Sequence, residues 1–317
     1  MKRSRNPSTS ALDLAAPFNR RAFLRGGAAT LAASALSLSR SLASAEDTAG
    51  PVIDTNTYLG PCPFRQLPQT TLLEKPDTVG VFAGSVGKNA TTAWASSFEA
   101  LLRRDYDDVN DRLFKLTQAD KNAARQFQLF GAINPKVSGW RETLRRIHQD
   151  YRMRGIRLHP NYHGYTLDDP DFAALLDAAA QRDLIVQIAL RMEDIRTQHP
   201  AASVADVDPR PLTELLPVLP GLKIQLLNAM HTLSDRLLLA RLSDLGVHFE
   251  IAMLEGMAGI ARLVERVPEI RLCYGSYAPF FYTEAAALKL VESAPELDPR
   301  IMAGIRSHHA ENLLLRS

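Results

Sequence analysis

The chain alternates between short apolar runs and longer segments in which apolar residues recur with helical spacing. Apolar runs rich in Ile, Val and Leu are typical of buried parallel strands, because helices cover both faces of such a sheet. Eight runs of this kind follow one another: Pro51–Asp54, Thr91–Ala95, Phe127–Ile133, Gly155–His159, Leu184–Leu190, Leu222–Leu227, Val247–Met253 and Ile270–Tyr274. We therefore predict eight strands.

Helical patterns separate these runs. Asp168-Asp169-Pro170 opens one helix with the acidic, proline-bearing first turn that helix starts favour, and others cover Leu233–Leu245, Met257–Val267 and Arg300–Leu315. Eight strand–helix units in about 270 residues predict one α/β domain, a (β/α)₈ TIM barrel. A doubly wound open sheet is the alternative, but no G-x-G-x-x-G follows the first run, which weakens its dinucleotide-binding form.

The N-terminal segment has a different composition. Arg20-Arg21-Ala22-Phe23-Leu24-Arg25 precedes a mildly apolar stretch, and Ala43-Ser44-Ala45 then supplies small residues for cleavage. This order predicts a twin-arginine signal peptide over residues 1–45, cleaved near Ala45, and a mature domain over 46–317. We expect the protein to engage the twin-arginine export machinery and to be periplasmic or otherwise exported. A disordered basic tail is the alternative.

The net charge changes sign when residues 1–45 are left out. The 317 residues hold 37 Lys+Arg and 35 Asp+Glu, a net charge of +2. Removing residues 1–45 takes away seven basic and one acidic residue, which leaves 30 against 34 and a net charge of −4. An acidic mature chain has no electrostatic reason to bind nucleic acid. No later run reaches 18 apolar residues, so no stable membrane span is predicted. The expected partner is a small molecule, and a homo-oligomer stays open.

Four segments resemble the motifs of one enzyme family. Ile53–Gly60 stands where that family has I-D-x-H-x-H-x-G, Gly155–Pro160 resembles G-x-x-L-x-P, Cys273–Pro279 resembles F-G-S-D-x-P, and Ile301–Leu313 resembles the closing helix. The family is the amidohydrolase superfamily, in the amidohydrolase-related branch that includes aminocarboxymuconate semialdehyde decarboxylase-like proteins. The resemblance covers residues 52–315. It implies a TIM barrel with hydrolase or decarboxylase-like lyase activity.

The resemblance also implies a divalent metal site whose residues are replaced in this chain. The family binds metal through two first-strand histidines, a fifth-strand and often a sixth-strand histidine, and an eighth-strand aspartate. The matching positions are Asn56, Tyr58, Ala189, Asn228 and Tyr277. Zinc requires three or more His, Cys or carboxylate ligands. No metal ligand is carried over and no cofactor is predicted, although a rearranged zinc or manganese site made by His159, His163 and Glu193 stays open.

Candidate chemistry gathers at the predicted strand ends, where barrel enzymes keep their active sites. His159 and His163 are predicted to act as general acid or base, with Glu193 as the carboxylate beside them. Arg157 and Arg191 are predicted to clamp a substrate carboxylate. The other predicted substrate-binding residues are Asn56, Tyr58, Tyr162, Gln187, His199, Asn228 and Tyr277.

Structural explanations compete with these roles. The loop after the fourth strand can be a hydrogen-bonded turn, the charges around Asp194 can be surface ion pairs, and His199 before Pro200 can mark a loop. Tyr58 and Tyr277 should face each other, because the first and last strands of a barrel are neighbours. We expect these two rings to fill space and bind rather than to catalyse.

Two functions follow from the sequence. The first is a hydrolase or decarboxylase-like lyase that acts on a small carboxylated or cyclic substrate without the usual metal. The second is a catalytically silent barrel that binds a ligand or a partner protein. Cys62 and Cys273 are predicted to be free thiols, because a cysteine inside a strand points into a packed layer.

Overall fold

The computed structural model describes residues 51–64, 66–67, 92–119 and 121–315, so the predicted signal peptide lies outside the described residues. Eight strands pair in parallel and in chain order. Their bounds are β1 Ile53–Leu59, β2 Thr92–Ser97, β3 Phe127–Ala132, β4 Gly155–Leu158, β5 Ile185–Ala189, β6 Lys223–Leu227, β7 His248–Glu250 and β8 Arg271–Cys273. All eight predicted strands are confirmed, and the doubly wound alternative is wrong because the strand order never reverses.

A short seam between β1 and the segment after β8 closes the sheet into a barrel. Thr57 and Ala278 form a parallel bridge. The backbone N–H groups of Thr55, Tyr58 and Tyr277 donate across the seam to Tyr274, Ala278 and Asn56, at 2.9, 2.8 and 2.8 Å. The fold is therefore a single parallel α/β barrel.

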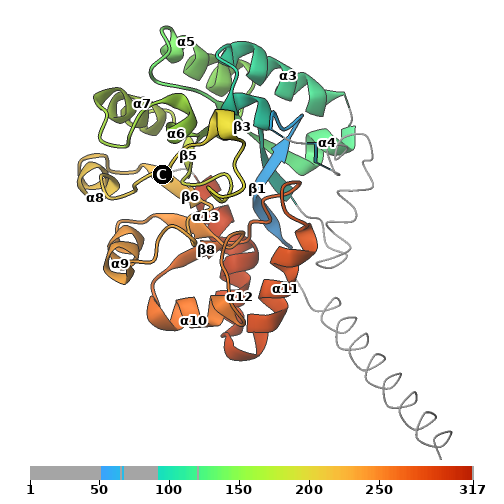
Figure 1. Cartoon of the computed structure of the whole chain (residues 1–317), viewed down its shortest axis with the longest axis vertical. Coiled ribbons are helices and arrows are strands. Elements are labelled where there is room, and N and C mark those ends of the chain that lie inside the picture. Colours follow the sequence, from blue (N-terminus) through green and yellow to red (C-terminus); the bar gives the residue numbers. More distant parts are fainter. Residues whose placement is uncertain (1–50, 65, 68–91, 120, 316–317) are drawn as a thin grey trace, which may run out of the picture. The chain divides into compact units, whose positions relative to one another are not determined.

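Helices surround the strands as an outer layer (Figure 1). Their bounds are α3 Tyr106–Gln118, α4 Lys121–Gln126, α5 Trp140–Arg145, α6 Pro160–His163, α7 Pro170–Ala180, α8 Leu212–Leu215, α9 Arg236–Asp244, α10 Gly259–Arg266, α11 Thr283–Ser293, α12 Pro299–Ala303 and α13 His309–Leu314. The predicted helix start at residues 168–170 is confirmed, because Asp169 caps α7 by accepting the Asp171 N–H at 2.9 Å. No helix in the described ranges is long and apolar enough to cross a membrane.

The C-terminal helix closes the amino-terminal end of the barrel. A π-helical turn, Gly304–His308, joins α12 to α13, so the predicted helix Arg300–Leu315 is interrupted there. Ala310 and Leu313 of α13 pack with buried side chains of β1, β2, β3, β5 and β8, which are Ile53, Trp94, Phe130, Ile185 and Cys273. The opposite, carboxyl-terminal end is where a site has to be sought.

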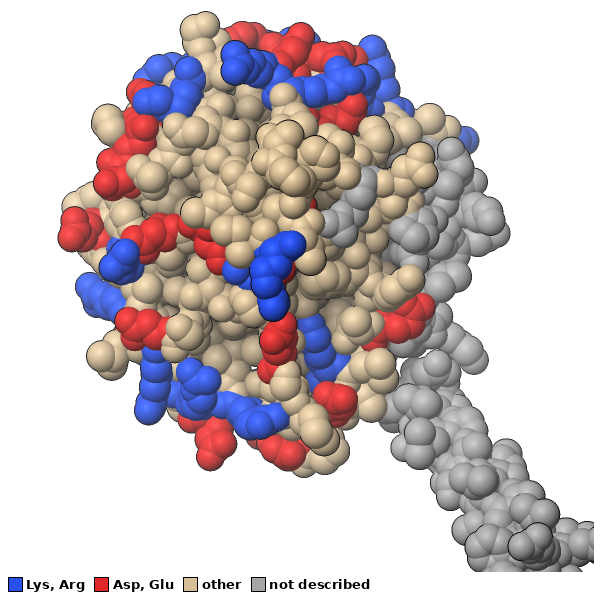
Figure 2. All heavy atoms as spheres, viewed as in Figure 1, with Lys and Arg blue, Asp and Glu red and all other residues tan. Residues whose placement is uncertain are grey.

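The outer surface carries mixed charge. On the face seen in Figure 2, Lys and Arg side chains alternate with Asp and Glu, and apolar or neutral residues separate the charged groups. Cys62 is half-buried and Cys273 is buried, and both are free thiols, as predicted.

Candidate functional site

A bulge in β1 shapes the centre of the barrel. The pairing of β1 with β2 shifts register between Asp54 and Thr57. The side chain of Arg157, which comes from β4, is buried in this part of the barrel. Its Nη1 donates to the Thr57 carbonyl at 2.6 Å. Its Nη2 donates to the carbonyls of Thr55 and Trp94 at 3.3 and 3.1 Å. Its Nε donates to a side chain of β5. The guanidinium thus lies inside the barrel with four hydrogen bonds.

Two glutamines continue this layer across the sheet. Gln187 of β5 accepts the Arg157 Nε–H at 2.8 Å and donates to the Thr55 carbonyl and to Gln225 of β6, both at 2.8 Å. Gln225 in turn donates to the Thr55 hydroxyl at 2.8 Å. The Gln187 amide is therefore bonded within the barrel rather than directed at a substrate. The clamp predicted for Arg157 is incompatible with this placement, because its donors face backbone carbonyls.

Two buried carboxyl groups lie near this layer. Asp54 accepts the Ser276 N–H at 3.0 Å and the Ser276 hydroxyl, which joins β1 to the end of β8. Glu250 of β7 accepts the backbone N–H groups of Asn228 and Ala252 at 2.6 and 2.5 Å. Burial is the main cause that raises the pKa of Asp54 to about 6 and that of Glu250 to about 7. Sequence reasoning missed Glu250, whose signal was an acid inside an apolar run.

Aromatic side chains fill the mouth of the barrel above these groups. Tyr58 and Tyr277 meet edge to face with centroids 5.8 Å apart, as predicted, and Tyr58 stacks on Phe98 at 4.5 Å. The Tyr277 hydroxyl donates to the Met192 carbonyl at 2.6 Å. All four side chains are at most 4% exposed. We call these four residues, Tyr58, Phe98, Met192 and Tyr277, the mouth layer.

The two candidate catalytic histidines lie beside the mouth layer. His159 is fully buried, and its Nε2 is 2.9 Å from the Tyr58 hydroxyl. The Nε2 of His163 donates to the Ala100 carbonyl at 2.9 Å, and the two imidazole centroids are 5.7 Å apart. Burial lowers the pKa of both rings, that of His163 to about 4, so both are neutral at pH 7. Neither Nδ1 has a hydrogen-bond partner.

An open cavity of about 630 Å³ lies next to the mouth layer, at the carboxyl ends of β5, β7 and β8. Phe280, which stacks on Tyr277 at 4.9 Å, and Phe281 form its apolar wall. Its lining also holds Glu193 but neither His159 nor His163. The predicted catalytic trio is therefore not brought together in this cavity.

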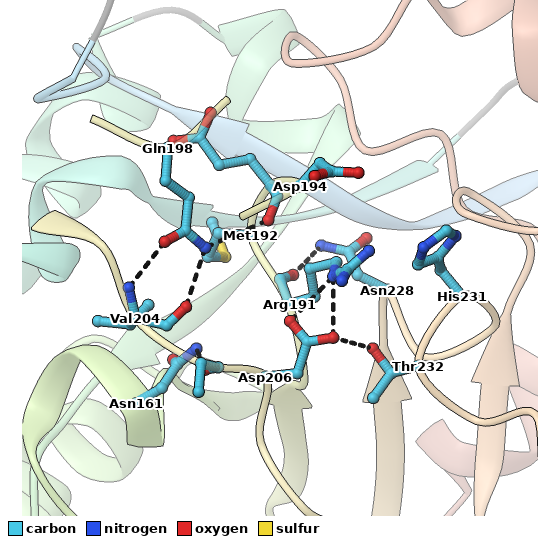
Figure 3. A network of polar contacts seen from close by, with 12 residues as sticks. Asn161, Arg191, Met192, Asp194, Gln198, Val204, Asp206, Asn228, His231 and Thr232 are labelled. Carbon is cyan, nitrogen blue, oxygen red and sulfur yellow. Dashed lines mark hydrogen bonds and ion pairs between the residues drawn. The ribbon is translucent and has the colours of Figure 1, made fainter. Parts of the chain in front are cut away.

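Side chains of the loop after β5 bond to one another and to the loop after β6 (Figure 3). The Nε of Arg191 donates to both carboxylate oxygens of Asp206 at 2.9 Å, and Thr232 donates to the same carboxylate at 2.8 Å. Asn228 donates its side-chain amide to the Arg191 carbonyl at 2.8 Å. Arg191 is thus paired with Asp206 through its Nε, and it also lines the cavity, so the carboxylate clamp predicted for it stays a prediction.

The remaining predicted residues have structural contacts. His199 is exposed and accepts the Ala201 N–H at 3.2 Å, so it caps a short 3₁₀ turn. Tyr162 is half-buried and its ring lies 5.8 Å from that of Phe64. Asp194 pairs with exposed Arg196 at 2.7 Å, as the surface ion-pair interpretation predicted.

Comparisons with known proteins agree with this architecture. The amidohydrolase family model matches residues 90–285, more than half of the chain. The chain belongs to the amidohydrolase family. No curated protein sequence matches it.

Three solved structures of similar fold are named as decarboxylases, and each is 12% identical to this chain. The 2,6-dihydroxybenzoate decarboxylase from Rhizobium has a TM-score of 0.62 and covers 84% of this chain and 98% of its own. The 5-carboxyvanillate decarboxylase from Sphingomonas paucimobilis has a TM-score of 0.60, and the match covers 84% of this chain and 99% of the decarboxylase. The dihydroxybenzoic acid decarboxylase from Polaromonas was solved with manganese and 2-nitroresorcinol. It has a TM-score of 0.60, and the match covers 84% of this chain and 97% of the decarboxylase. At this identity the likeness shows the fold.

The residues of this family member do not fit the metal of the family. Asn56 donates its amide to Asn228 at 2.9 Å and to Glu250 at 3.3 Å, the Tyr277 hydroxyl donates to Met192, and Ala189 has no ligand atom. Throughout the described ranges, which include His159, His163 and Glu193, no three His, Cys, Asp or Glu side chains gather as a metal site would need. We therefore assign no chemical step to a metal ion.

Proposed function

We propose that this amidohydrolase-family barrel binds a small ring-containing molecule in the cavity beside the mouth layer, and that it does so without metal-dependent chemistry. The main support for this proposal is the packing of the mouth layer. Its four side chains fill the place at the barrel mouth where the family is expected to hold metal and substrate, and they are at most 4% exposed. The open volume lies next to them instead.

The lining of this cavity supports a ring-shaped ligand. A volume of about 630 Å³ is within the range of small-molecule sites. Phe280 and Phe281 meet edge to face at 5.6 Å and offer aromatic surface. Around them, Glu193, His231 and Lys289 supply a few polar groups that can orient a ligand. His231 lies 3.6 Å from the Glu255 carboxylate.

Calorimetric titration tests the proposal with three ring compounds of different charge: 2,6-dihydroxybenzoate, resorcinol and benzamidine. We expect at least one to bind and to raise the thermal unfolding midpoint. Phe281→Ala should weaken that binding roughly tenfold, because it removes an aromatic wall. Phe114→Ala is the matched control, since Phe114 packs on Tyr151 outside the barrel. Equal weakening by both variants, or no binding at all, contradicts the proposal.

A decarboxylase-like lyase is the second candidate, in line with the decarboxylases of similar fold. The observation that favours it is Glu193, a carboxyl side chain that is 4% exposed and lines the cavity. Loss of carbon dioxide from a ring requires a proton at the carbon that loses the carboxylate, and a carboxyl group can deliver it. Release of carbon dioxide from 2,6-dihydroxybenzoate, abolished in Glu193→Gln and kept in Glu214→Gln, a substitution at an exposed residue of α8, would support this lyase. A protein that binds the ring compound but releases no carbon dioxide would be a binding protein only.

We also propose that the mature domain, residues 46–317, is exported after cleavage near Ala45. The support is the order of parts in residues 1–45, with Arg20 and Arg21 before the apolar stretch. Cell fractionation should find the full-length chain processed and outside the cytoplasm. Arg20→Lys combined with Arg21→Lys should hold the precursor inside, whereas Arg40→Lys should not.

A further inference from the structure

Arg157 has an unusual position for a cation. In the described part of the chain it is the only Lys or Arg side chain that is buried, and its exposure is 0%. Burying an isolated charge is costly unless hydrogen bonds and counter-charges surround it. The surroundings of Arg157 should therefore show what the charge does.

We infer that Arg157 supplies the positive charge at the centre of this barrel and links β1 to the opposite strands, in place of the metal ion that the family resemblance leads one to expect. The inference concerns the interior of the barrel and does not depend on what the neighbouring cavity binds.

The contacts connect four strands. Arg157 comes from β4 and donates to two carbonyls of the β1 bulge, to the Trp94 carbonyl of β2 and to Gln187 of β5. In the family motif, the first-strand histidines reach the other strands through a metal. Here Asn56 and Tyr58 stand at those two positions, and the guanidinium of Arg157 is the charged group among the side chains that connect β1 to the facing strands.

The surrounding charges match a cation. Asp54 and Glu250 are both fully buried, and their carboxylate forms oppose the lowering of the Arg157 pKa that burial causes. The guanidinium carbon also lies 4.5 Å from the centroid of the Tyr58 ring, a cation–π contact. The positive charge thus lies near two acids, three carbonyl groups and two aromatic rings, those of Tyr58 and Phe130.

The shape of the group explains why arginine rather than lysine stands there. The guanidinium is planar and carries five N–H donors in a fixed fork, and here four hydrogen bonds point to four different acceptors. An ammonium offers three donors on one atom and cannot reach acceptors spread over three strands.

Thermal unfolding of the purified mature chain is the first test, with EDTA, with added zinc and with added manganese. Elemental analysis of the same sample accompanies it. We expect no stoichiometric metal and an unchanged midpoint in all three conditions, because only a ligand that binds the folded state raises the midpoint. Stoichiometric zinc, manganese or iron, or a midpoint that falls with EDTA, would overturn the inference.

The second test removes the charge. Arg157→Gln should lower the midpoint by roughly 10 °C, because the acceptors of a buried charged network lose their donor. Arg154→Gln is the matched control, since Arg154 is exposed and its side chain donates to the Leu314 carbonyl at 3.0 Å. Arg157→Lys should recover only part of the loss. If Arg157→Gln does not fold, Gln187→Leu takes its place, with an intermediate decrease expected. Equal midpoints for the Arg157 and Arg154 variants, or for Gln187→Leu and the wild type, would contradict the role of Arg157.

Discussion

The Tyr58 ring lies between the guanidinium of Arg157, whose carbon is 4.5 Å from the ring centroid, and the Phe98 ring, whose centroid is also 4.5 Å away. The hydroxyl of Tyr58 also forms a hydrogen bond with the Nε2 of His159. One side chain of β1 therefore connects the polar centre of the barrel to its mouth layer.

Substitution of Tyr58 separates these two contacts. Tyr58→Phe keeps the ring and loses the hydroxyl, so it should lower the free energy of unfolding by about 1 kcal/mol. Tyr58→Leu also loses the stacking and the cation–π contact and should cost about 3 kcal/mol. Urea denaturation measures both. If the two variants lose the same free energy, the ring contacts contribute nothing and only the hydroxyl matters.

Glu250 should make stability depend on pH. Its pKa is raised to about 7 in the folded state, above the ordinary value near 4.5, because burial penalises the carboxylate. The folded protein therefore holds a proton that the unfolded chain releases, and the free energy of unfolding falls by about 3 kcal/mol as pH rises from about 4.5 to about 7.

The comparison with Glu250→Gln isolates this contribution. Buried His163 has a lowered pKa and acts in the opposite direction over an overlapping pH range, so a single curve does not resolve the two groups. The difference in unfolding free energy between wild type and Glu250→Gln should change with pH between 4.5 and 7. A difference that is constant over that range would show that Glu250 does not titrate there.

The pairing of Arg191 with Asp206 should hold the loop after β5. Asp206→Asn removes a charge whose pair is largely shielded from solvent, with side chains 13% and 24% exposed, and should cost about 1–2 kcal/mol. Asp208→Asn is the control in the same loop, because its pair with Arg210 is 48% and 76% exposed and should contribute little to stability. Faster proteolysis within residues 191–207 should accompany the first variant only.

The two thiols should differ in reactivity. Cys62 is half-buried, whereas Cys273 is fully buried in β8 and burial raises the pKa of its thiol. Titration with a thiol reagent should modify one cysteine in the folded chain and the second only after unfolding. The Cys62→Ser variant should show no reaction while folded, and rapid labelling of that variant would contradict the packing described for β8.

The sequence predicted the fold well because strands buried on both faces leave continuous apolar runs. It was less accurate about strand ends. The run Val247–Met253 continues beyond β7, which ends at Glu250, because Ile251, Ala252 and Met253 are buried without being paired. Apolarity reports removal from water rather than strand pairing.

The site was harder to predict because the sequence does not show which groups each polar side chain meets. Arg157 and Arg191 were both expected to hold a carboxylate, yet one meets carbonyls exposed by the β1 bulge and the other meets Asp206. Residue types at a strand end show which groups can ionise or donate. They do not show which backbone carbonyls a bulge turns toward them, so the direction of each side chain had to come from the structure.

The mouth layer has a consequence for how this scaffold can change. Its side chains separate the interior, where each group is hydrogen-bonded or packed, from a rim where Glu255, Leu288 and Glu292 line the cavity. Mutations at these rim positions can vary the chemistry of the pocket while the interior beneath keeps its contacts. A mutational library restricted to the rim should therefore yield folded proteins of altered selectivity, which makes the barrel a robust starting point for laboratory evolution.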